Sequence, residues 1–453
     1  MTLKISTENK IFYKEMLAIA IPVMLQQLII VAVQLCDTIM VGSLGEEPLA
    51  AVGAANQIFI VYIDSIFGFL SGVAVFSAQY WGIKDLKALR SLLGLGYVTV
   101  FVFGAITTVI VYWQAPFLLS LFTDNQEVIA LGIKYIRIAV FTYLVGALTF
   151  VVSYNSRVVS MLKWPTIINA LAVVINIFLN WVFIFGHLGA KPMGVEGAAT
   201  ATLIARITEF TLTIIYIYVA KDHPLQASIK EMKFSFSLFK EVIKTAFPVV
   251  LNEVLWVLSF TATFAIYGKI SAVALAVVQI AMTVTDIFQS LFFGMANGCS
   301  VIIGKTLGRG EREEGYKIAQ KCIKITWLLN AICTLLLILA RGPIVAIYSF
   351  SAATNELLYS SLLVYALAIT PRMLPYVYIC GIFRPGGDTL WSAVVDGGIN
   401  WLLDVPLAWI SVVVLGLPLP ACIAVVALAE GVKGIICHLR FRTKKWINVF
   451  TGN

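Results

Sequence analysis

Long apolar runs alternate with short polar connections along the whole chain. The first run starts at Met16, reads MLAIAIPVMLQQLIIVAVQLC, and is followed directly by Asp37. A helix needs about 20 apolar residues to cross the roughly 30 Å of a bilayer's hydrocarbon core, whereas a barrel strand needs only about 10. Runs of this length therefore predict spanning helices. We expect twelve, at 16–40, 50–78, 92–114, 130–154, 165–186, 196–220, 242–267, 274–303, 322–340, 356–382, 390–415 and 419–439.

The composition agrees with a lipid environment. The 453 residues are 60% hydrophobic and only 12% charged, whereas an ordinary soluble domain is about 25% charged. A large soluble core cannot explain this deficit, because a soluble protein still needs a polar surface. We therefore expect an all-α integral membrane protein. The lysines before the first run suggest a signal peptide, but the run is long and lacks an A-x-A site, which favours a retained helix.

Basic residues occur in every second connection between the predicted helices. They lie at 84–90, 157–163, 221–240, 305–317, 384 and 440–445. The other connections, such as SLGEEP and FTDNQE, are poor in Lys and Arg. By the positive-inside rule, the basic connections and both termini lie in the cytoplasm. The net charge of +8 is thus explained by membrane topology, and we expect the basic connections to contact lipid. The sequence contains no compact basic domain that would bind nucleic acid.

The two halves of the sequence repeat each other. At an offset of 226 residues, Pro22 aligns with Pro248 and Gly42 with Gly268, and GFLSGVAVFSAQYWGIKD lies over GMANGCSVIIGKTLGRGE. Six spans per half return the chain to the same side, so the repeats are parallel, as in some transporters. We expect an N-terminal six-helix lobe at 1–220, a cytoplasmic linker at 221–240 and a C-terminal six-helix lobe at 241–453.

Motifs for nucleotide hydrolysis or membrane-embedded catalysis are missing. A P-loop requires four residues between its glycines, but GCSVIIGKT has five and closes a predicted helix. The three histidines lie near helix ends, and neither HExxH nor a DxxxD cluster occurs. We therefore expect neither an ATP-driven pump nor an enzyme, and we predict no cofactor and no metal centre.

Several stretches, in this order and spacing, resemble the multidrug and toxic compound extrusion (MATE) family across residues 12–440. They are IPVMLQQ, CDTIMVGSLGEEPLAAVGAANQI, GFLSGVAVFSAQYWGIKD, INIFLNWVFIFG with GVEGAATAT, AFPVVLNEV and GIFRPGGDT. The resemblance implies two six-helix lobes around a central cleft. It also implies exchange of an inward Na⁺ or H⁺ for an outgoing amphipathic compound that is often cationic.

Asp37 is the first candidate for coupling transport to an ion. A carboxylate within an apolar span is costly and usually functional. It can take up and release H⁺ or offer oxygen atoms to Na⁺; the alternative is an interfacial Asp that reaches water near Gly42. Asn176 and Asn180 lie four residues apart on one helix face. Their amides can complete a cation site with Asp37 or bond between helices, and family members often carry Asp at the position of Asn180.

Glu253 is the candidate in the second half, because it matches an acidic position that family members use for the cation. Some members place a second acid in helix ten, where this sequence has Arg372 instead. Arg372 could therefore neutralise Glu253 in a buried pair. In this part of the repeat the offset becomes 224 residues, so Asp404 overlies Asn180, which makes it a further ion-coupling candidate. We expect Asp37 and Glu253 to contact the cargo as well.

Other charged residues in the spans have structural interpretations. The spacing of Arg206 with Glu209, and of Glu430 with Lys433, predicts ion pairs one turn apart. Arg384 and its neighbour Asp388 match a family loop motif, and we expect them to form a turn or gate contact.

The sequence therefore predicts a monomeric Na⁺- or H⁺-coupled antiporter in the cytoplasmic (inner) membrane of a bacterium, which exports amphipathic drugs or toxic compounds by alternating access. The alternative is a flippase for a lipid-linked precursor. Flippase clefts tend to be cationic because their cargo carries pyrophosphate. Here the charges in the spans are mixed, with Asp37, Glu253 and Asp404 against Arg206 and Arg372, and this mixture favours a cationic cargo.

Overall fold

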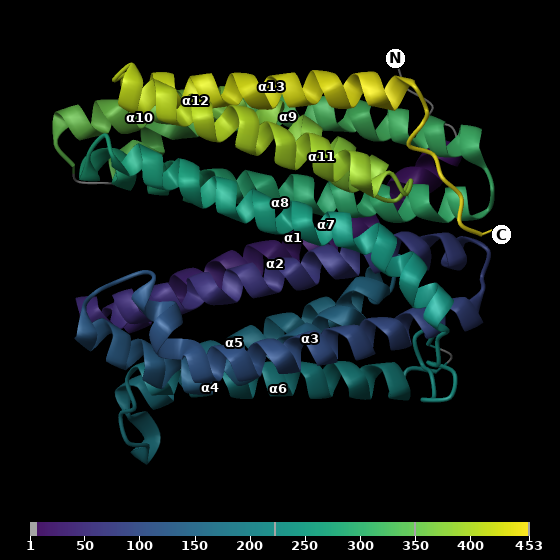
Figure 1. The fold of residues 1–453 in the computed structure, drawn as a ribbon, viewed down its shortest axis with the longest axis horizontal. Coiled ribbons are helices and arrows are strands. Elements are labelled where there is room, and N and C mark those ends of the chain that lie inside the picture. The colour runs from purple at the N-terminus through teal and green to yellow at the C-terminus, as the bar shows by residue number, and fades with distance from the viewer. Residues whose placement is uncertain (1–6, 222, 348–349, 452–453) are drawn as a thin grey trace. The chain divides into compact units, whose positions relative to one another are not determined.

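The fold is all-helical in the computed structural model, which describes residues 7–221, 223–347 and 350–451 (Figure 1). The α-helices are α1 (Thr7–Gly42), α2 (Glu46–Gly82), α3 (Leu86–Ser120), α4 (Gln126–Val158), α5 (Lys163–Phe185), α6 (Val195–Val219), α7 (Phe236–Gly268), α8 (Ala272–Gly308), α9 (Arg312–Ile347), α10 (Ala352–Tyr376), α11 (Thr389–Ile399), α12 (Val405–Trp409) and α13 (Leu419–Arg442). A 3₁₀ turn occupies His187–Gly189, and π-helical turns occupy Val377–Phe383, Asn400–Asp404 and Ile410–Val414.

Twelve helical segments among the described residues are long and apolar enough to cross a membrane, and these residues contain no β-strand. The predicted fold class and its twelve spans are therefore confirmed. Most helices extend past the predicted limits because their polar end turns still form helix. Side-chain caps fix several starts: Asp85 accepts from the backbone of Ala88 at α3, and Asn125 accepts from that of Glu127 at α4.

The tenth and eleventh spans contain π-helical turns that follow from proline. Pro406 has no backbone N–H to donate into the preceding turn. Just before it, the Val405 amide bonds to the Asn400 carbonyl five residues back, and Asn400–Asp404 is π-helical. The segment Val377–Phe383 likewise follows Pro375 and ends with the amide of Arg384 on the carbonyl of Ile379. Such turns often mark functional sites.

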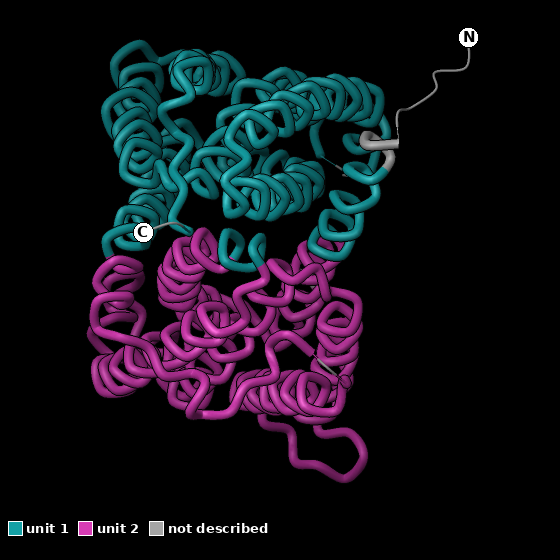
Figure 2. Tube along the Cα trace, turned by 90° about the vertical axis from the view of Figure 1, so that its right-hand side faces the viewer, with its two compact units in different colours: residues 1–24, 78–83, 244–453 teal, residues 25–77, 84–243 magenta. Residues whose placement is uncertain are grey.

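The chain divides into two compact units (Figure 2). Unit 1 comprises residues 1–24, 78–83 and 244–453, and unit 2 comprises residues 25–77 and 84–243. Residues 221–240, the predicted linker, contain the turns that join α6 to α7 and the start of α7. The predicted lobe boundaries remain a prediction.

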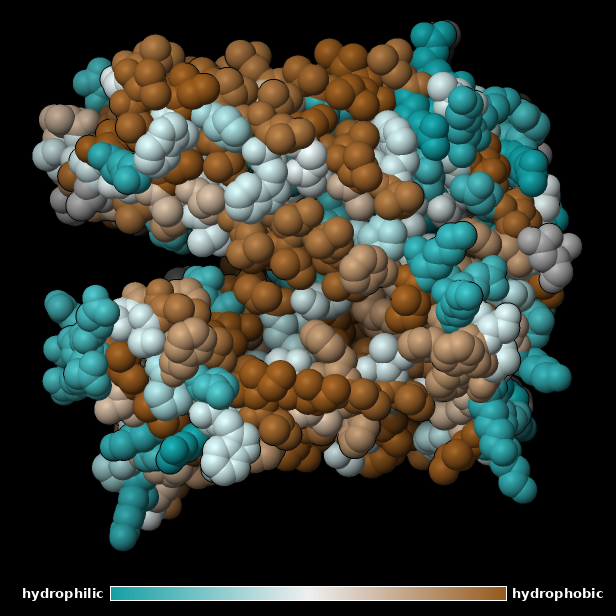
Figure 3. All heavy atoms as spheres, in the orientation of Figure 1, coloured by the Kyte–Doolittle hydropathy of each residue, from teal (hydrophilic) through white to brown (hydrophobic). Residues whose placement is uncertain are grey.

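Apolar side chains cover much of the visible helix surface, and hydrophilic residues gather towards the helix ends (Figure 3). Large exposed hydrophobic residues include Trp113, Leu339 and Leu402, at 75%, 67% and 76% exposure. A soluble protein rarely exposes so much contiguous apolar surface. The surface therefore fits lipid along the middle of each helix and water at the ends.

Close backbone contact explains two of the repeated glycines. In unit 1, a Cβ added to Gly308 would lie 2.0 Å from the carbonyl oxygen of Gln79, and one added to Gly82 would lie 2.2 Å from that of Lys305. Only glycine permits this approach between the ends of α2 and α8. The matched Gly82 and Gly308 therefore both lie at this close contact.

The segment after α13 packs back onto this contact. Trp446 is fully buried, and Asn448 donates to the carbonyl of Gly386. Gln79 donates to the carbonyl of Asn448 at 3.1 Å and accepts the amide of Phe450 at 2.7 Å. These bonds satisfy a side chain that is itself completely buried.

Candidate functional site

Asp37 lies near the end of α1 and meets α5 within unit 2. The Asn180 side-chain amide donates to the Asp37 carboxylate at 2.5 Å. Arg206 on α6 is close enough to interact electrostatically with this carboxylate. The structure thus brings together two of the residues that the sequence singled out, although 143 positions separate them.

Asn176 lies one turn earlier on α5 and donates to the hydroxyl of Thr202 on α6 at 3.2 Å. The side-chain oxygens of Asn176 and Asn180 are both buried and have no hydrogen-bond partner within the described part of the chain. Buried amide oxygens are normally paired, and a cation or a donor from water would pair them. Thr202 was not predicted, because a threonine in an alanine-rich helix start gives no signal of its own.

Glu253 on α7 forms a buried ion pair in unit 1, but not with the expected partner. The Arg384 guanidinium contacts its carboxylate at 2.5 Å, and the two side chains are 4% and 14% exposed. The sequence hypothesis that Arg372 neutralises Glu253 is therefore wrong. Arg384 lies in the turn that directly follows the π-helical end of the tenth span, and its side chain is buried there.

Asp388, the acidic residue of the loop motif, binds a different cation. Its carboxylate accepts from Arg440 on α13 at 2.8 and 3.0 Å. The two predicted one-turn ion pairs are confirmed: Arg206 with Glu209 at 2.7 Å, and Lys433 with Glu430 at 2.9 Å.

Lys433 on α13 is the centre of a polar network inside unit 1. Its ammonium group contacts Asp396 at 2.8 Å, Glu430 at 2.9 Å and the Asn400 side-chain oxygen at 2.7 Å. Asn252 on α7 donates to the second oxygen of Asp396 at 3.0 Å. Asp396 escaped the sequence analysis, although an acid within the eleventh apolar span gives the same signal as Asp37.

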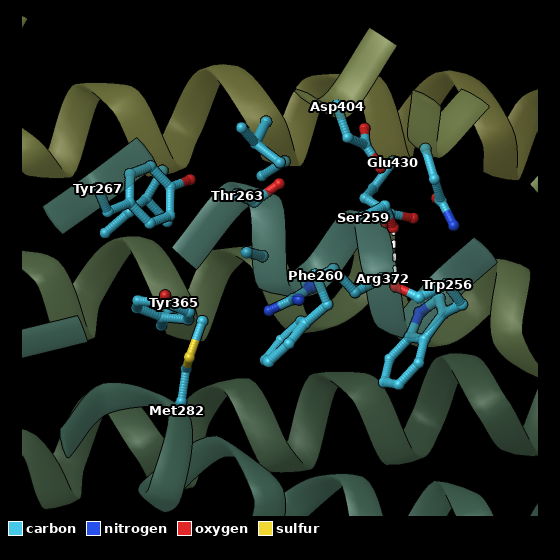
Figure 4. Close-up of a pocket in the computed structure, with 15 residues that line it drawn as sticks. Trp256, Ser259, Phe260, Thr263, Tyr267, Met282, Tyr365, Arg372, Asp404 and Glu430 are labelled. Atoms are coloured by element: carbon cyan, nitrogen blue, oxygen red, sulfur yellow. Dashed lines mark hydrogen bonds between the residues drawn. The ribbon is translucent and has the colours of Figure 1, made fainter. Parts of the chain in front are cut away.

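Asp404 closes the π-helical turn beside this network and lines a cavity of about 60 Å³ (Figure 4). Aromatic side chains form much of its wall, and Asn400, Arg372 and Glu430 add polar groups. One water needs about 15 Å³ of such space, so the cavity admits about four. Drug-sized ligands need roughly 300–1,000 Å³ and do not fit. Neither Asp37 nor Glu253 lines this cavity.

Polar and charged groups in the connection between α6 and α7 are held by local contacts. The backbone amide and hydroxyl of Ser228 hold the pKa of Glu231 below its ordinary value, and Arg90 lowers this pKa further. Burial lowers the pKa of His223 in the same connection. Among the described residues, no cluster of three or more His, Cys, Asp or Glu side chains could hold a metal ion.

Comparison with known proteins identifies the family to which the chain is related. The MatE family model matches residues 22–182 and 248–410, and the two blocks start 248 − 22 = 226 residues apart, which is the offset of the sequence repeat. The probable multidrug resistance protein YoeA of Bacillus subtilis is 24% identical over 406 residues, covering 88% of this chain and 86% of its own.

Two further proteins are similar. The probable multidrug resistance protein NorM of Rhizobium meliloti is 28% identical over 303 residues, which cover 66% of this chain and 64% of that relative. A MOP superfamily transporter from Pyrococcus furiosus, described as having a binding pocket of reverse polarity that suggests a different function, shares the fold. Its TM-score is 0.86 at 19% identity, with 95% of each chain covered.

Proposed function

Because the chain belongs to the MatE family of multi-pass membrane transporters, we propose that it is a cation-coupled antiporter that exports amphipathic, often cationic compounds. Transport proceeds by alternating access, as in other secondary transporters built from repeats. The names of its relatives, multidrug resistance proteins, support this class of cargo. Both termini lie in the cytoplasm, the protein is a monomer, and the membrane is the bacterial inner membrane.

The observation that carries the proposal is the acid site of unit 2. Asn180 donates a hydrogen bond to the Asp37 carboxylate, and the buried side-chain oxygens of Asn176 and Asn180 have no partner among the described residues. Na⁺ is a hard cation that binds carboxylate and amide oxygens of this kind. A proton would bind the Asp37 carboxylate alone. Either occupant removes the negative charge that makes this position costly in a membrane.

Ion and cargo act through the equilibrium between two arrangements of the protein. Neutralising Asp37 stabilises the arrangement in which the site is shielded from water, and binding of cargo stabilises the other. A ligand shifts such an equilibrium only by its difference in affinity for the two states. Asp37 therefore has to exchange its ion between the two states, and we assign it contact with the cationic cargo as well.

Glu253 is the proposed second-half ion-coupling and cargo residue, and its availability depends on Arg384. While the 2.5 Å ion pair holds, the carboxylate is neutralised. A cargo cation reaches Glu253 only by displacing the guanidinium. Asp404 is assigned to the same half, in the cavity lined by Arg372 and Glu430.

The alternative function, a flippase for an anionic lipid-linked precursor, requires basic groups free to bind pyrophosphate. The Pyrococcus furiosus neighbour makes this alternative worth testing. However, the buried cations Arg384 and Lys433 each already contact a carboxylate. Their pairing favours the antiporter.

The test is dye efflux from vesicles under separate Na⁺ and pH gradients. We expect efflux driven by one gradient, abolished in Asp37→Asn and reduced in Glu253→Gln. Asp124→Asn, which changes an exposed acid between α3 and α4, is the matched control and retains efflux. Normal efflux in both site variants would refute the assigned residues. Translocation of a fluorescent pyrophosphate lipid without dye efflux would establish the flippase.

A further inference from the structure

The cavity in unit 1 is surrounded by more acids than bases. Lys433 on α13 is shared by the carboxylates of Asp396 and Glu430. Asp404 is a third acid, and its side chain lies within hydrogen-bonding reach of Glu430 (Figure 4). Among the described residues that line the cavity, Arg372 is the one base; Lys433 does not line the cavity but contacts Glu430, which does. Three ionised carboxylates against two cations leave one uncompensated negative charge inside the membrane.

Other titratable groups that face Asp404 or its neighbours do not remove this excess. Asp286 on α8 interacts with Arg372 and adds a further negative charge. Glu253 and Arg384 neutralise each other. The cavity lining also includes the hydroxyl groups of Tyr267 on α7 and Tyr365 on α10.

Two buried polar atoms at this cavity also lack partners. One carboxylate oxygen of Asp404 has no hydrogen bond to any residue that the structure describes, although Asp404 is only 6% exposed. The side-chain nitrogen of Asn400, a residue that is 2% exposed, has none either. Both residues line the cavity, and its volume of about 60 Å³ is large enough for a few waters. The unpaired atoms mark the place where a small polar ligand belongs.

We propose that Asp404 and Glu430 form a proton-binding carboxyl pair, in which one proton is shared between the two side chains and exchanged with water in the cavity. Two carboxylates within hydrogen-bonding reach cannot both stay ionised without a compensating charge. One added proton turns the acceptor–acceptor contact into a hydrogen bond and cancels one of the uncompensated negative charges. The proposal rests on the proposed function only for the use that transport makes of this proton.

The step is a simple proton transfer. A hydronium ion in the cavity gives its proton to one carboxylate and leaves as water; the new O–H then donates to the other carboxylate. Release reverses these events. A metal cation fits less well, because the Lys433 ammonium already occupies the Asn400 oxygen at 2.7 Å and Arg372 also lines the cavity. Both would repel it.

The experiment is infrared difference spectroscopy of the purified full-length protein in lipid nanodiscs, between acidic and alkaline buffer without Na⁺. A protonated carboxyl group has a C=O stretch separate from the carboxylate bands. We expect one such band that titrates and shifts in D₂O, and that is lost in both Asp404→Asn and Glu430→Gln. Glu356→Gln, an exposed acid near the start of α10, is the matched control and keeps it.

Loss of the band in only one of the two variants would overturn the shared proton, and its persistence in both would overturn the site. Wild-type protein without a titrating carboxyl band overturns the proposal without any variant, so misfolding of a variant cannot protect it. These spectra contain no cargo and no gradient. A failure of dye efflux would therefore count against the antiporter and leave the proton site standing.

Discussion

The ion pair between Glu253 and Arg384 gives the sharpest test of the structure, because the sequence pointed to a different partner, Arg372. At a separation of 2.5 Å and an effective dielectric constant of about 20, the attraction between the two charges is about 7 kcal/mol. Removing both ions from water offsets much of it, at several kcal/mol per ion. The pair therefore contributes little to the net free energy of unfolding, but removing either partner alone is costly.

Arg384→Met leaves the Glu253 carboxylate buried without its cation. Breaking a buried pair in this way costs about 3–5 kcal/mol of unfolding free energy. Glu253→Gln keeps the shape and can still accept a hydrogen bond, so we expect about 1–3 kcal/mol. In the double variant no buried charge is stranded, and its loss should be smaller than the sum of the two single losses by about 1–3 kcal/mol.

The assay is a double-mutant cycle on unfolding in mixed detergent and SDS micelles, followed by tryptophan fluorescence. A parallel cycle pairs Glu253→Gln with Arg372→Met. We expect this second cycle to be additive within about 0.5 kcal/mol, because Arg372 is not the ion-pair partner of Glu253 in the structure. Coupling to Arg372 in place of Arg384 would refute the packing of the tenth span described above.

Three further predictions concern single positions. Asp37→Asn should lower the rate of gradient-driven dye efflux by at least about tenfold, which corresponds to about 1.4 kcal/mol, because both ion coupling and the contact with the cationic cargo are lost; an unchanged rate would exclude coupling at this acid. Because the donors of Ser228 lower the pKa of Glu231 below its ordinary value of 4.5, the carboxylate stabilises the fold above that pH and loses this effect as pH falls through the lowered value. The Tm difference between wild type and Glu231→Gln should therefore shrink on acidification, and a difference independent of pH would contradict the assignment. Gly308→Ala places a Cβ 2.0 Å from a carbonyl oxygen of α2 and should cost about 1–3 kcal/mol, whereas Gly342→Ala, which meets nothing within 4 Å, should be neutral or slightly stabilising; equal effects in thermal unfolding would contradict the close contact.

The spans could be predicted from the sequence because lipid imposes a simple condition on each run. A segment such as Met16–Cys36 has to be helical to satisfy its backbone in hydrocarbon, whatever it packs against. The repeat was likewise readable, because glycines at positions such as 82 and 308 are required by a close contact between backbones. The ends of the helices were not, because their polar turns look like connections.

The contacts between side chains inside the site could be predicted from the sequence only in part. Asn180 could be linked to Asp37 because both interrupt apolar faces and family resemblance brings their helices together. The partner of Glu253 could not be chosen by pattern, because 131 positions separate it from Arg384 and Arg372 satisfied the same criterion. The π-helical turns decide which side chains point inward, and their exact extent depends on tertiary packing as well as on the nearby prolines. Asp396, in contrast, was visible in the sequence as an intramembrane acid and was overlooked.

The contact between Gln79 and the segment after α13 has a consequence for biosynthesis. Gln79 leaves the ribosome 371 residues before Phe450, the residue whose amide it finally accepts. At about 5–20 residues per second, this interval lasts roughly 20–75 seconds. During that time the end of α2 lacks the segment after α13 that later buries it. The contact between Gln79 and this segment therefore forms among the last events of assembly, long after α2 itself has entered the bilayer.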